Sequence, residues 1–357
     1  MSFRTLLDGL AIPIIQAPML GASDQALAIA VGGAGGMGTL AAGGLAPADI
    51  AAAVAEIRAA TDRPFGVNLL MAPKVSPDAG EVEAALARLA PWYAELGVAV
   101  PAAPNQFAPD FDAQFEALVG AAPPVASFAF GVLARDQVAA LQRAGSYVVG
   151  TANTVAEARA WAEAGADGIC AQGAEAGGHH AYFLEDIEAS LIGTFALVAT
   201  IRTAVDLPVI AAGGIMDGRG VAAALALGAA AALMGTAFLL SDEVTISQPW
   251  RAAIEAAPDD PTRLTRALTG RYARGVENRF MREMRAVERE VPAYPVQNRL
   301  TQPLRAAAAK ASEPQMLSLW AGQAVRLARP GEAADLVRRW WAEARDAARE
   351  LAQRTAN

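Results

Sequence analysis

Short apolar runs alternate with longer stretches of helical periodicity through the first 240 residues, and this alternation limits what the chain can fold into. Apolar runs of this kind are typical of strands that are buried on both faces in a parallel sheet covered by helices. Eight such units close a TIM barrel, so we predict the α/β class and a (β/α)8 barrel. The expected strands are at 12–16, 38–40, 65–68, 125–130, 147–149, 168–171, 209–211 and 231–234, with helices at 24–31, 47–60, 81–96, 136–144, 155–164, 190–203 and 220–227.

The rest of the chain has a different composition. From about Ser241 onward the sequence is richer in Arg, Glu and Trp and shows no convincing strand, and residues 332–351 have the pattern of a terminal helix. We therefore predict two parts. Residues 1–240 form the TIM-barrel domain with the ligand site, and residues 241–357 form a mostly helical cap and C-terminal segment packed on the barrel.

The composition excludes several classes of protein. Of 357 residues, 54% are hydrophobic and 18% charged, which rules out a disordered chain. With 29 basic and 37 acidic residues the net charge is −8, whereas nucleic-acid binders present a basic face, so we expect no nucleic-acid partner. The single cysteine, Cys170, excludes a disulfide framework and a multi-cysteine metal site. The only histidines, His179 and His180, are adjacent, so we expect no His-rich metal centre.

We expect no targeting or membrane segment. Asp8 and Pro13 interrupt the N-terminal region where a signal peptide needs an unbroken apolar run. Residues 221–240 carry no charge, but they are mostly Ala and Gly and divide at Gly228 into a helix-like and a strand-like half. A buried helix–strand pair fits this pattern better than a membrane span. The sequence therefore predicts a soluble, cytoplasmic protein with no membrane partner.

The segment Gly33–Gly38 (GAGGMG) fits the dinucleotide-binding pattern GxGxxG. The pattern has that meaning only where a strand precedes it and a helix follows. Here a helical stretch precedes it and a strand follows. We therefore interpret these glycines as the end of the first helix and the turn back into the barrel, not as a Rossmann site.

Two glycine-containing loops follow the seventh and eighth expected strands, where TIM barrels commonly bind phosphate. They contain Gly213-Gly214 and Gly235-Thr236. Glycine lets backbone N–H groups approach a ligand closely, and a short helix N-terminus adds a favourable dipole. The alternative is that these glycines only make tight turns. We favour a phosphate site, and because no P-loop lysine follows, we expect one terminal phosphate of a cofactor or substrate.

The loop after the sixth expected strand contains both histidines, in the sequence QGAEAGGHH (172–180). Gly177 and Gly178 would let the backbone lie flat against a planar ligand, with His179 at the barrel mouth. Imidazole titrates near neutrality and suits proton abstraction beside a carbonyl or nitro group. The alternatives are a structural or surface histidine, or Glu175 as the base. Glu175 ranks lower, because a carboxylate here can also order the loop through backbone hydrogen bonds.

These segments resemble the nitronate monooxygenase family, formerly called 2-nitropropane dioxygenases, which are FMN-dependent TIM barrels. The resemblance covers nearly the whole chain and implies FMN as the cofactor of the 1–240 domain. It is carried by PIIQAPM (13–19), FGVN (65–68), AQGAEAGGH (171–179), AAGGIMDGRG (211–220), MGTAFL (234–239), TGRYARGVENRF (269–280) and LWAGQ (319–323).

The resemblance also implies roles for individual residues. His179, in the AGGH motif, would be the catalytic base. The FMN-binding residues would be Met19, Asn68, Gln172, Gly177, Gly178, Gly213, Gly214, Met234, Gly235 and Thr236, with the last five around the phosphate. The implied reaction is oxidative denitrification, in which a nitronate, or a nitroalkane deprotonated by His179, reacts with O2 to give a carbonyl compound and nitrite. We also consider a homodimer.

The chain departs from the family pattern at two places. Many members continue as GGHRG, where this chain has His180 and Ala181. The best-studied subgroup has a tyrosine and a lysine after Tyr294-Pro295, where this chain has Asn298 and Gln302. The alternative enzyme is an NAD(P)H-dependent FMN reductase of the same superfamily that acts on quinones or enoyl thioesters. A flavin-binding protein without turnover and a flavin-free phosphosugar isomerase are two further possibilities.

Overall fold

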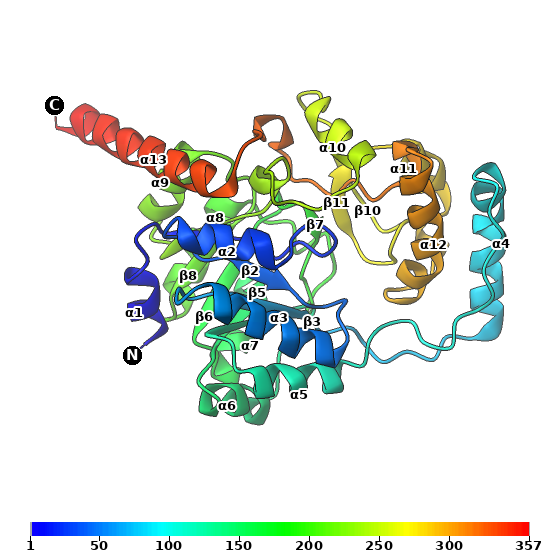
Figure 1. Cartoon of the computed structure of the whole chain (residues 1–357), viewed down its shortest axis with the longest axis horizontal. Coiled ribbons are helices and arrows are strands. Elements are labelled where there is room, and N and C mark those ends of the chain that lie inside the picture. The colour runs from blue at the N-terminus through cyan, green and yellow to red at the C-terminus, as the bar shows by residue number, and fades with distance from the viewer. Residues whose placement is uncertain (1, 357) are drawn as a thin grey trace.

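The computed structural model describes residues 2–356, and within that range eight parallel strands form a nearly closed barrel (Figure 1). Their order around the sheet is β1-β9-β8-β6-β5-β4-β3-β2, and a bridge between Ile15 and Met37 brings the two ends together. The predicted (β/α)8 barrel is confirmed. The strands are β1 (Ile14–Gln16), β2 (Thr39–Ala41), β3 (Gly66–Leu70), β4 (Val125–Ala129), β5 (Tyr147–Ala152), β6 (Gly168–Gln172), β8 (Val209–Ala212) and β9 (Ala231–Met234).

One end of the barrel is closed by packed side chains. Phe3 and Leu7 of α1 (Phe3–Asp8) cluster with inward-pointing residues of the strands, including Ile15, Val149 and Ile210. This end is the N-terminal end of the strands. The opposite end, where the strands lead into their loops, is therefore left for a ligand.

Helices cover the outside of the barrel, and most lie where the apolar periodicity predicts them. In α3, for example, Ile50, Val54 and Ile57 are buried on one face. None of the helices in residues 2–356 combines the length and the apolar character needed to span a bilayer. The covering helices are α2 (Gln25–Gly33), α3 (Pro47–Ala60), α5 (Phe111–Ala121), α6 (Arg135–Arg143), α7 (Val155–Ala164), α8 (Thr194–Ala204) and α9 (Gly218–Ala226).

Two interpretations of glycine positions are confirmed. Gly33 is the last residue of α2, and a Cβ on Gly38 would lie 2.2 Å from the Ala28 carbonyl oxygen. The GxGxxG segment is thus a close helix–strand contact. Gly228, at φ +89°, separates α9 from β9, as expected for the uncharged stretch 221–240.

The helix expected at 81–96 forms, but it does not cover the barrel. α4 (Ala79–Glu95) stands apart, beside α12 (Val296–Lys310) (Figure 1). The Tyr93 hydroxyl donates a hydrogen bond of 2.7 Å to the Leu300 carbonyl, and the Trp92 ring packs on Phe280 at 4.7 Å. Its place beside α3 is taken by α5, which the sequence analysis did not find. Periodicity shows that a helix has an apolar face, but not which partner covers that face.

The segment after Ser241 contains strands as well as helices, which corrects the expectation of no strand. β10 (Thr262–Thr265) pairs antiparallel with β11 (Ala273–Val276), and β11 pairs with β7 (Gly178–His179) from the loop after β6. Both tail strands are only four residues long and mix polar with apolar residues, so their conformation depends on the pairing rather than on a local pattern. The helices are α10 (Gln248–Glu255), α11 (Arg279–Met284), α12 and α13 (Ala333–Thr355).

The tail therefore does two things. Its middle part, with β10, β11, α11 and α12, lies over the C-terminal end of the barrel together with α4, and we call this set the cap (Figure 1). Its last helix, α13, packs on α9 and α2 at the side of the barrel. The cap thus draws on two separate segments of the chain.

Candidate active site

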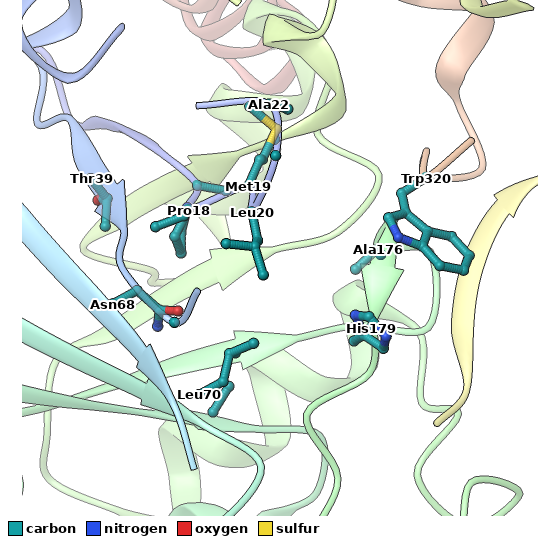
Figure 2. A pocket seen from close by; sticks show the side chains of 18 of the residues that line it. Pro18, Met19, Leu20, Ala22, Thr39, Asn68, Leu70, Ala176, His179 and Trp320 are labelled. Carbon is teal, nitrogen blue, oxygen red and sulfur yellow. The ribbon is translucent and has the colours of Figure 1, made fainter. Parts of the chain in front are cut away.

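A cavity of about 960 Å³ lies between the strand ends of the barrel and the cap. Ligand pockets typically measure about 300–1,000 Å³, so this one can hold a cofactor together with a small substrate. Figure 2 shows Met19 and Asn68 on the barrel side, and His179 and Trp320 on the opposite side of the space. Ten of the eleven predicted site residues line the cavity: Met19, Asn68, Gln172, Gly177, Gly178, His179, Gly213, Gly214, Gly235 and Thr236.

Met234 is the exception. Its side chain is fully buried in the core between the barrel and its helices, because the last residue of β9 points outward. Its carbonyl accepts a hydrogen bond of 2.8 Å from the Ala17 amide and so helps to fix the loop after β1. Met234 supports the site from behind but does not line it.

The glycine loops form an uncovered stretch of backbone on the barrel side. Gly213 and Gly214 have φ values of +112° and +70°, which side chains rarely adopt. A Cβ on Gly213 would lie 2.8 Å from the Thr194 hydroxyl oxygen. Gly235 faces only Ala17 and Met19. Gly213 and Gly214 are thus required by their turn, and the same geometry exposes bare backbone where a phosphate could bind.

The two glycines before His179 have different roles. Gly178, at φ +72°, has open space where a Cβ would lie, as expected for backbone beside a flat ligand. A Cβ on Gly177 would lie 2.5 Å from the Gly322 amide nitrogen. Glycine at position 177 therefore leaves room for the tail segment to pack against the loops. The Gly322 amide donates a hydrogen bond of 2.9 Å to the Thr236 hydroxyl and holds the tail there.

Two amide side chains predicted to contact a ligand also hold the loops. The Gln172 side-chain amide donates a hydrogen bond of 3.1 Å to the His179 carbonyl, and its oxygen accepts one of 2.8 Å from the Ala181 amide. Gln172 therefore fixes the histidine-containing loop against the end of β6. The Asn68 amide donates to the Ser127 carbonyl and hydroxyl at 3.2 and 3.1 Å, and its side chain projects toward the cavity (Figure 2).

His179 is held by the small sheet and by rings. It lies opposite Ala273 of β11, so the tail sets the position of a barrel-loop residue. The rings of Phe130, Tyr294 and Trp320 surround the imidazole at centroid distances of 5.8, 5.8 and 5.5 Å. The imidazole therefore has a fixed orientation in a mostly apolar setting.

A hydrogen-bond chain defines which ring nitrogen of His179 carries the proton. The His179 Nε2 atom lies 2.9 Å from the Thr269 hydroxyl oxygen, and that hydroxyl donates a hydrogen bond of 3.0 Å to the Arg271 carbonyl. We assign the hydroxyl proton to the carbonyl, since a carbonyl can only accept; with that assignment Thr269 accepts from the imidazole, and Nε2 carries the N–H. Nδ1 is then the unprotonated nitrogen, and it has no hydrogen-bond partner among residues 2–356.

The surroundings of His179 disfavour its charged form. Burial, together with the positive charges of Arg271 and Arg305, lowers the pKa of His179 to about 3. The imidazole is therefore neutral at pH 7 and has a free lone pair. A neighbouring anion, in contrast, would be stabilised by the same arginines.

Glu175 does not act in the cavity. Its carboxylate accepts two hydrogen bonds of 3.0 and 2.9 Å from the Thr194 amide, at the start of α8, and one of 2.7 Å from the Thr194 hydroxyl. These bonds order the loop. This is the structural role for which Glu175 ranks below His179 as a candidate base. Within residues 2–356, no group of three His, Cys, Asp or Glu side chains could hold a metal ion.

Comparison with known proteins decides the family. The nitronate monooxygenase family model matches residues 3–343. The chain belongs to the nitronate monooxygenase family. A "probable nitronate monooxygenase" of Staphylococcus aureus (strain Newman) is 38% identical over 317 residues, which cover 88% of this chain and 89% of that protein. The chain is accordingly an oxidoreductase.

Solved structures agree with this assignment. The nitroalkane oxidase from Streptomyces ansochromogenes is 44% identical, with a TM-score of 0.90 over 97% of this chain and 99% of that one. FabK from Thermotoga maritima is more distant, at 29% identity and a TM-score of 0.75, with 98% of each chain covered. The barrel fold and the oxidation of nitro compounds or nitronates are therefore the properties that these comparisons support.

Arg271 is a site residue that the sequence marks only as part of the family-like segment TGRYARGVENRF (269–280). Its guanidinium is stacked between the rings of Phe130 and Tyr182, at 4.2 and 4.3 Å. It donates to the carbonyls of His180 and Tyr182, the first at 2.9 Å. Arg271 thereby fixes the backbone that follows His179. No local signal in the sequence predicts this contact, because it joins positions about 90 residues apart.

His180, where many members of the nitronate monooxygenase family have an arginine, lies outside the cavity. It is fully buried, and both ring nitrogens lack a hydrogen-bond partner among the described residues. Burial, with the charges of Arg274 and Arg271, lowers its pKa to about 4. Of the adjacent histidines, only His179 can therefore contact a ligand.

Proposed function

We propose that this chain catalyses the FMN-dependent oxidative denitrification of alkyl nitronates, in which a nitronate and O2 give a carbonyl compound and nitrite. Family membership and the likeness to a nitroalkane oxidase support the reaction class. The observation that carries the proposal is a neutral imidazole, His179, that lines the same ligand-sized cavity as bare glycine loops.

The residues present fit FMN. The uncovered backbone at Gly213, Gly214 and Gly235 suits its phosphate, with Thr236 beside them. The open space at Gly178 suits a flat ring. When bound, FMN supplies the electron-transfer chemistry between the substrate and O2, while the protein supplies position, a base and a polar environment.

His179 is the proposed base for nitroalkanes. Its Nδ1 lone pair takes the proton from the carbon next to the nitro group, and Thr269 keeps the proton on Nε2 throughout. A low pKa makes His179 a weak acceptor, but Arg271 and Arg305 stabilise the anion that remains. A nitronate is already deprotonated, so its turnover requires no base. We therefore expect nitronates to be the better substrates.

Two measurements test the function. The absorbance spectrum of the purified protein should show oxidised flavin, and heat-released cofactor should be FMN. Nitrite should form from propionate-3-nitronate or simple alkyl nitronates in the presence of O2. A colourless protein that cannot be loaded with FMN, or a flavoprotein that gives no nitrite from any nitronate, would contradict the proposal.

A second candidate is an NAD(P)H-dependent FMN reductase, the alternative that the sequence leaves open, and the chain shares its fold with FabK at 29% identity. Anaerobic mixing with NADH or NADPH separates the two. Rapid flavin bleaching favours the reductase, whereas bleaching only with a nitronate favours nitronate oxidation. A cytoplasmic location and a homodimer remain predictions.

A further inference from the structure

The cavity face of α12 carries an unusual positive charge. Leu300, Leu304 and Ala308 are buried on the other face of the helix, while its cavity-lining residues are Asn298, Arg299, Gln302, Arg305, Ala306 and Ala309. Among the described residues that line the cavity, the only charged side chains are Arg299 and Arg305, although the whole chain has a net charge of −8. The cavity is therefore positive in an acidic protein.

Arg305 is a partly buried cation without an acidic partner. Its Nη2 donates to the Asn298 carbonyl and side-chain oxygens at 3.0 and 2.8 Å, and its Nη1 reaches the Ser318 hydroxyl at 3.4 Å. Its Nε is buried and has no partner among residues 2–356. No carboxylate of the described chain forms an ion pair with Arg305. The side chains that act on it electrostatically are the phenols of Tyr93 and Tyr294.

This arrangement is costly unless an anion completes it. Burial lowers the pKa of Arg305 to about 10, so the guanidinium still carries its charge at pH 7. A buried charge normally has a partner of opposite sign, because the transfer out of water is expensive. Arg299 is different, since it is exposed and pairs with the Gln302 amide oxygen.

The charge lies on the side of the reacting base. Arg305 acts electrostatically on His179 and on Tyr294, both of which belong to the cap side of the cavity. The glycine loops proposed for the phosphate belong to the barrel side. An anion next to Arg305 is thus expected from the substrate rather than from the cofactor.

We propose that Arg305 binds an anionic group of the substrate, so that the cavity selects small organic anions over neutral molecules of the same shape. In taking that substrate to be a nitronate, the inference rests on the proposed function. The anion can be the nitronate group itself or a carboxylate elsewhere in the same molecule, since a guanidinium recognises both.

Steady-state kinetics test the proposal with a substrate in two charge states. A nitroalkane and its own nitronate share one carbon skeleton and differ by a proton. For Arg305→Gln, KM for the nitronate should rise about 10- to 100-fold, the loss expected for a hydrogen bond to a charged group. KM for the neutral nitroalkane should change by less than about 3-fold. Arg305→Lys should recover part of the loss.

A second substrate pair distinguishes the source of the anion. If Arg305 binds the nitronate group, ethyl nitronate and propionate-3-nitronate should lose affinity equally. If it binds a distant carboxylate, only propionate-3-nitronate should lose affinity. Arg282→Gln, which removes one exposed charge from α11, is the matched control and should alter neither KM. The proposal is overturned if neither nitronate loses affinity, or if neutral nitroethane loses as much affinity as ethyl nitronate.

A binding measurement makes the result independent of turnover. By calorimetry, propanoate should bind the wild-type holoprotein more tightly than its neutral analogue propionamide, and Arg305→Gln should weaken propanoate binding about 10-fold or more. If nitronates give no nitrite but propanoate still depends on Arg305, only the proposed reaction fails. If propanoate does not bind, or binds equally to both proteins, the anion site fails. Thermal melts of the Gln and Lys variants show whether each is folded.

Discussion

The two sides of the cavity are built in different ways. On the barrel side the cavity is lined by backbone and neutral groups, with Gly213, Gly214 and Asn68 at the ends of buried strands. On the cap side the cavity is lined by side chains, with His179 in a ring of aromatics and Arg305 on α12. Under the proposed function, holding the cofactor and acting on the substrate fall to separate parts of the fold. Mutations should therefore separate them.

The largest effect should come from filling the barrel side. Gly213→Val places a β-branched side chain at φ +112° and within 2.8 Å of the Thr194 hydroxyl. Strain and overpacking together should cost about 2–5 kcal/mol of stability and abolish FMN binding. Denaturant unfolding and the FMN content per chain measure these. Gly120→Ala, in α5 with open space around it, is the control and should retain FMN. A Gly213→Val protein with full FMN would disprove the proposed phosphate site.

The next effect concerns the base on the cap side. His179→Asn should retain FMN but lower kcat/KM for neutral nitroalkanes about 10²- to 10⁴-fold, the usual contribution of a general base. Turnover of nitronates should fall much less, because they need no deprotonation. The matched control is His180→Asn, which should keep nitroalkane activity. If the effects of the two variants are exchanged, the assignment of the base is wrong.

A smaller loss should follow removal of the group that positions the base. Thr269→Val removes the acceptor for His179 Nε2–H and should reduce nitroalkane kcat/KM about 10-fold, with nitronate turnover unchanged. Thr269→Ser should restore it. Because the chain has only two histidines, ¹⁵N NMR of histidine-labelled protein can report the tautomer directly. A wild-type spectrum with the proton on Nδ1 would contradict the proposed hydrogen-bond chain.

The smallest effect concerns stability at the boundary between the two sides. Folded His180 stays neutral down to about pH 4, whereas the unfolded side chain takes up a proton near pH 6.5. The wild-type protein therefore loses stability as the pH falls from 6.5 toward 4. His180→Leu should remove about 1–2 kcal/mol of this loss at pH 5. Urea unfolding at pH 7 and pH 5 measures it, and an equal pH dependence in both proteins would refute the explanation.

The barrel could be predicted from the sequence because its signals are local. A strand buried on both faces appears as an apolar run, and the strand Ala231–Met234 has the predicted bounds. Once strands are placed, the topology puts the residues that follow them at one end. Gly213, Gly235 and His179 could therefore be placed together without knowledge of any contact between them.

The cap and the finer chemistry were decided only by tertiary contacts. The strand pairing of His179 with Ala273 joins residues far apart in the chain, and the short strands β10 and β11 carry no pattern of their own. Thr269, Arg271 and Arg305 are ordinary polar residues in the sequence, and only their neighbours in space give them a role. The sequence alone determined a barrel with glycine loops and a histidine at one end. The tertiary structure decided which nitrogen of that histidine is free and which charges surround it, because hydrogen bonds and burial depend on three-dimensional distance.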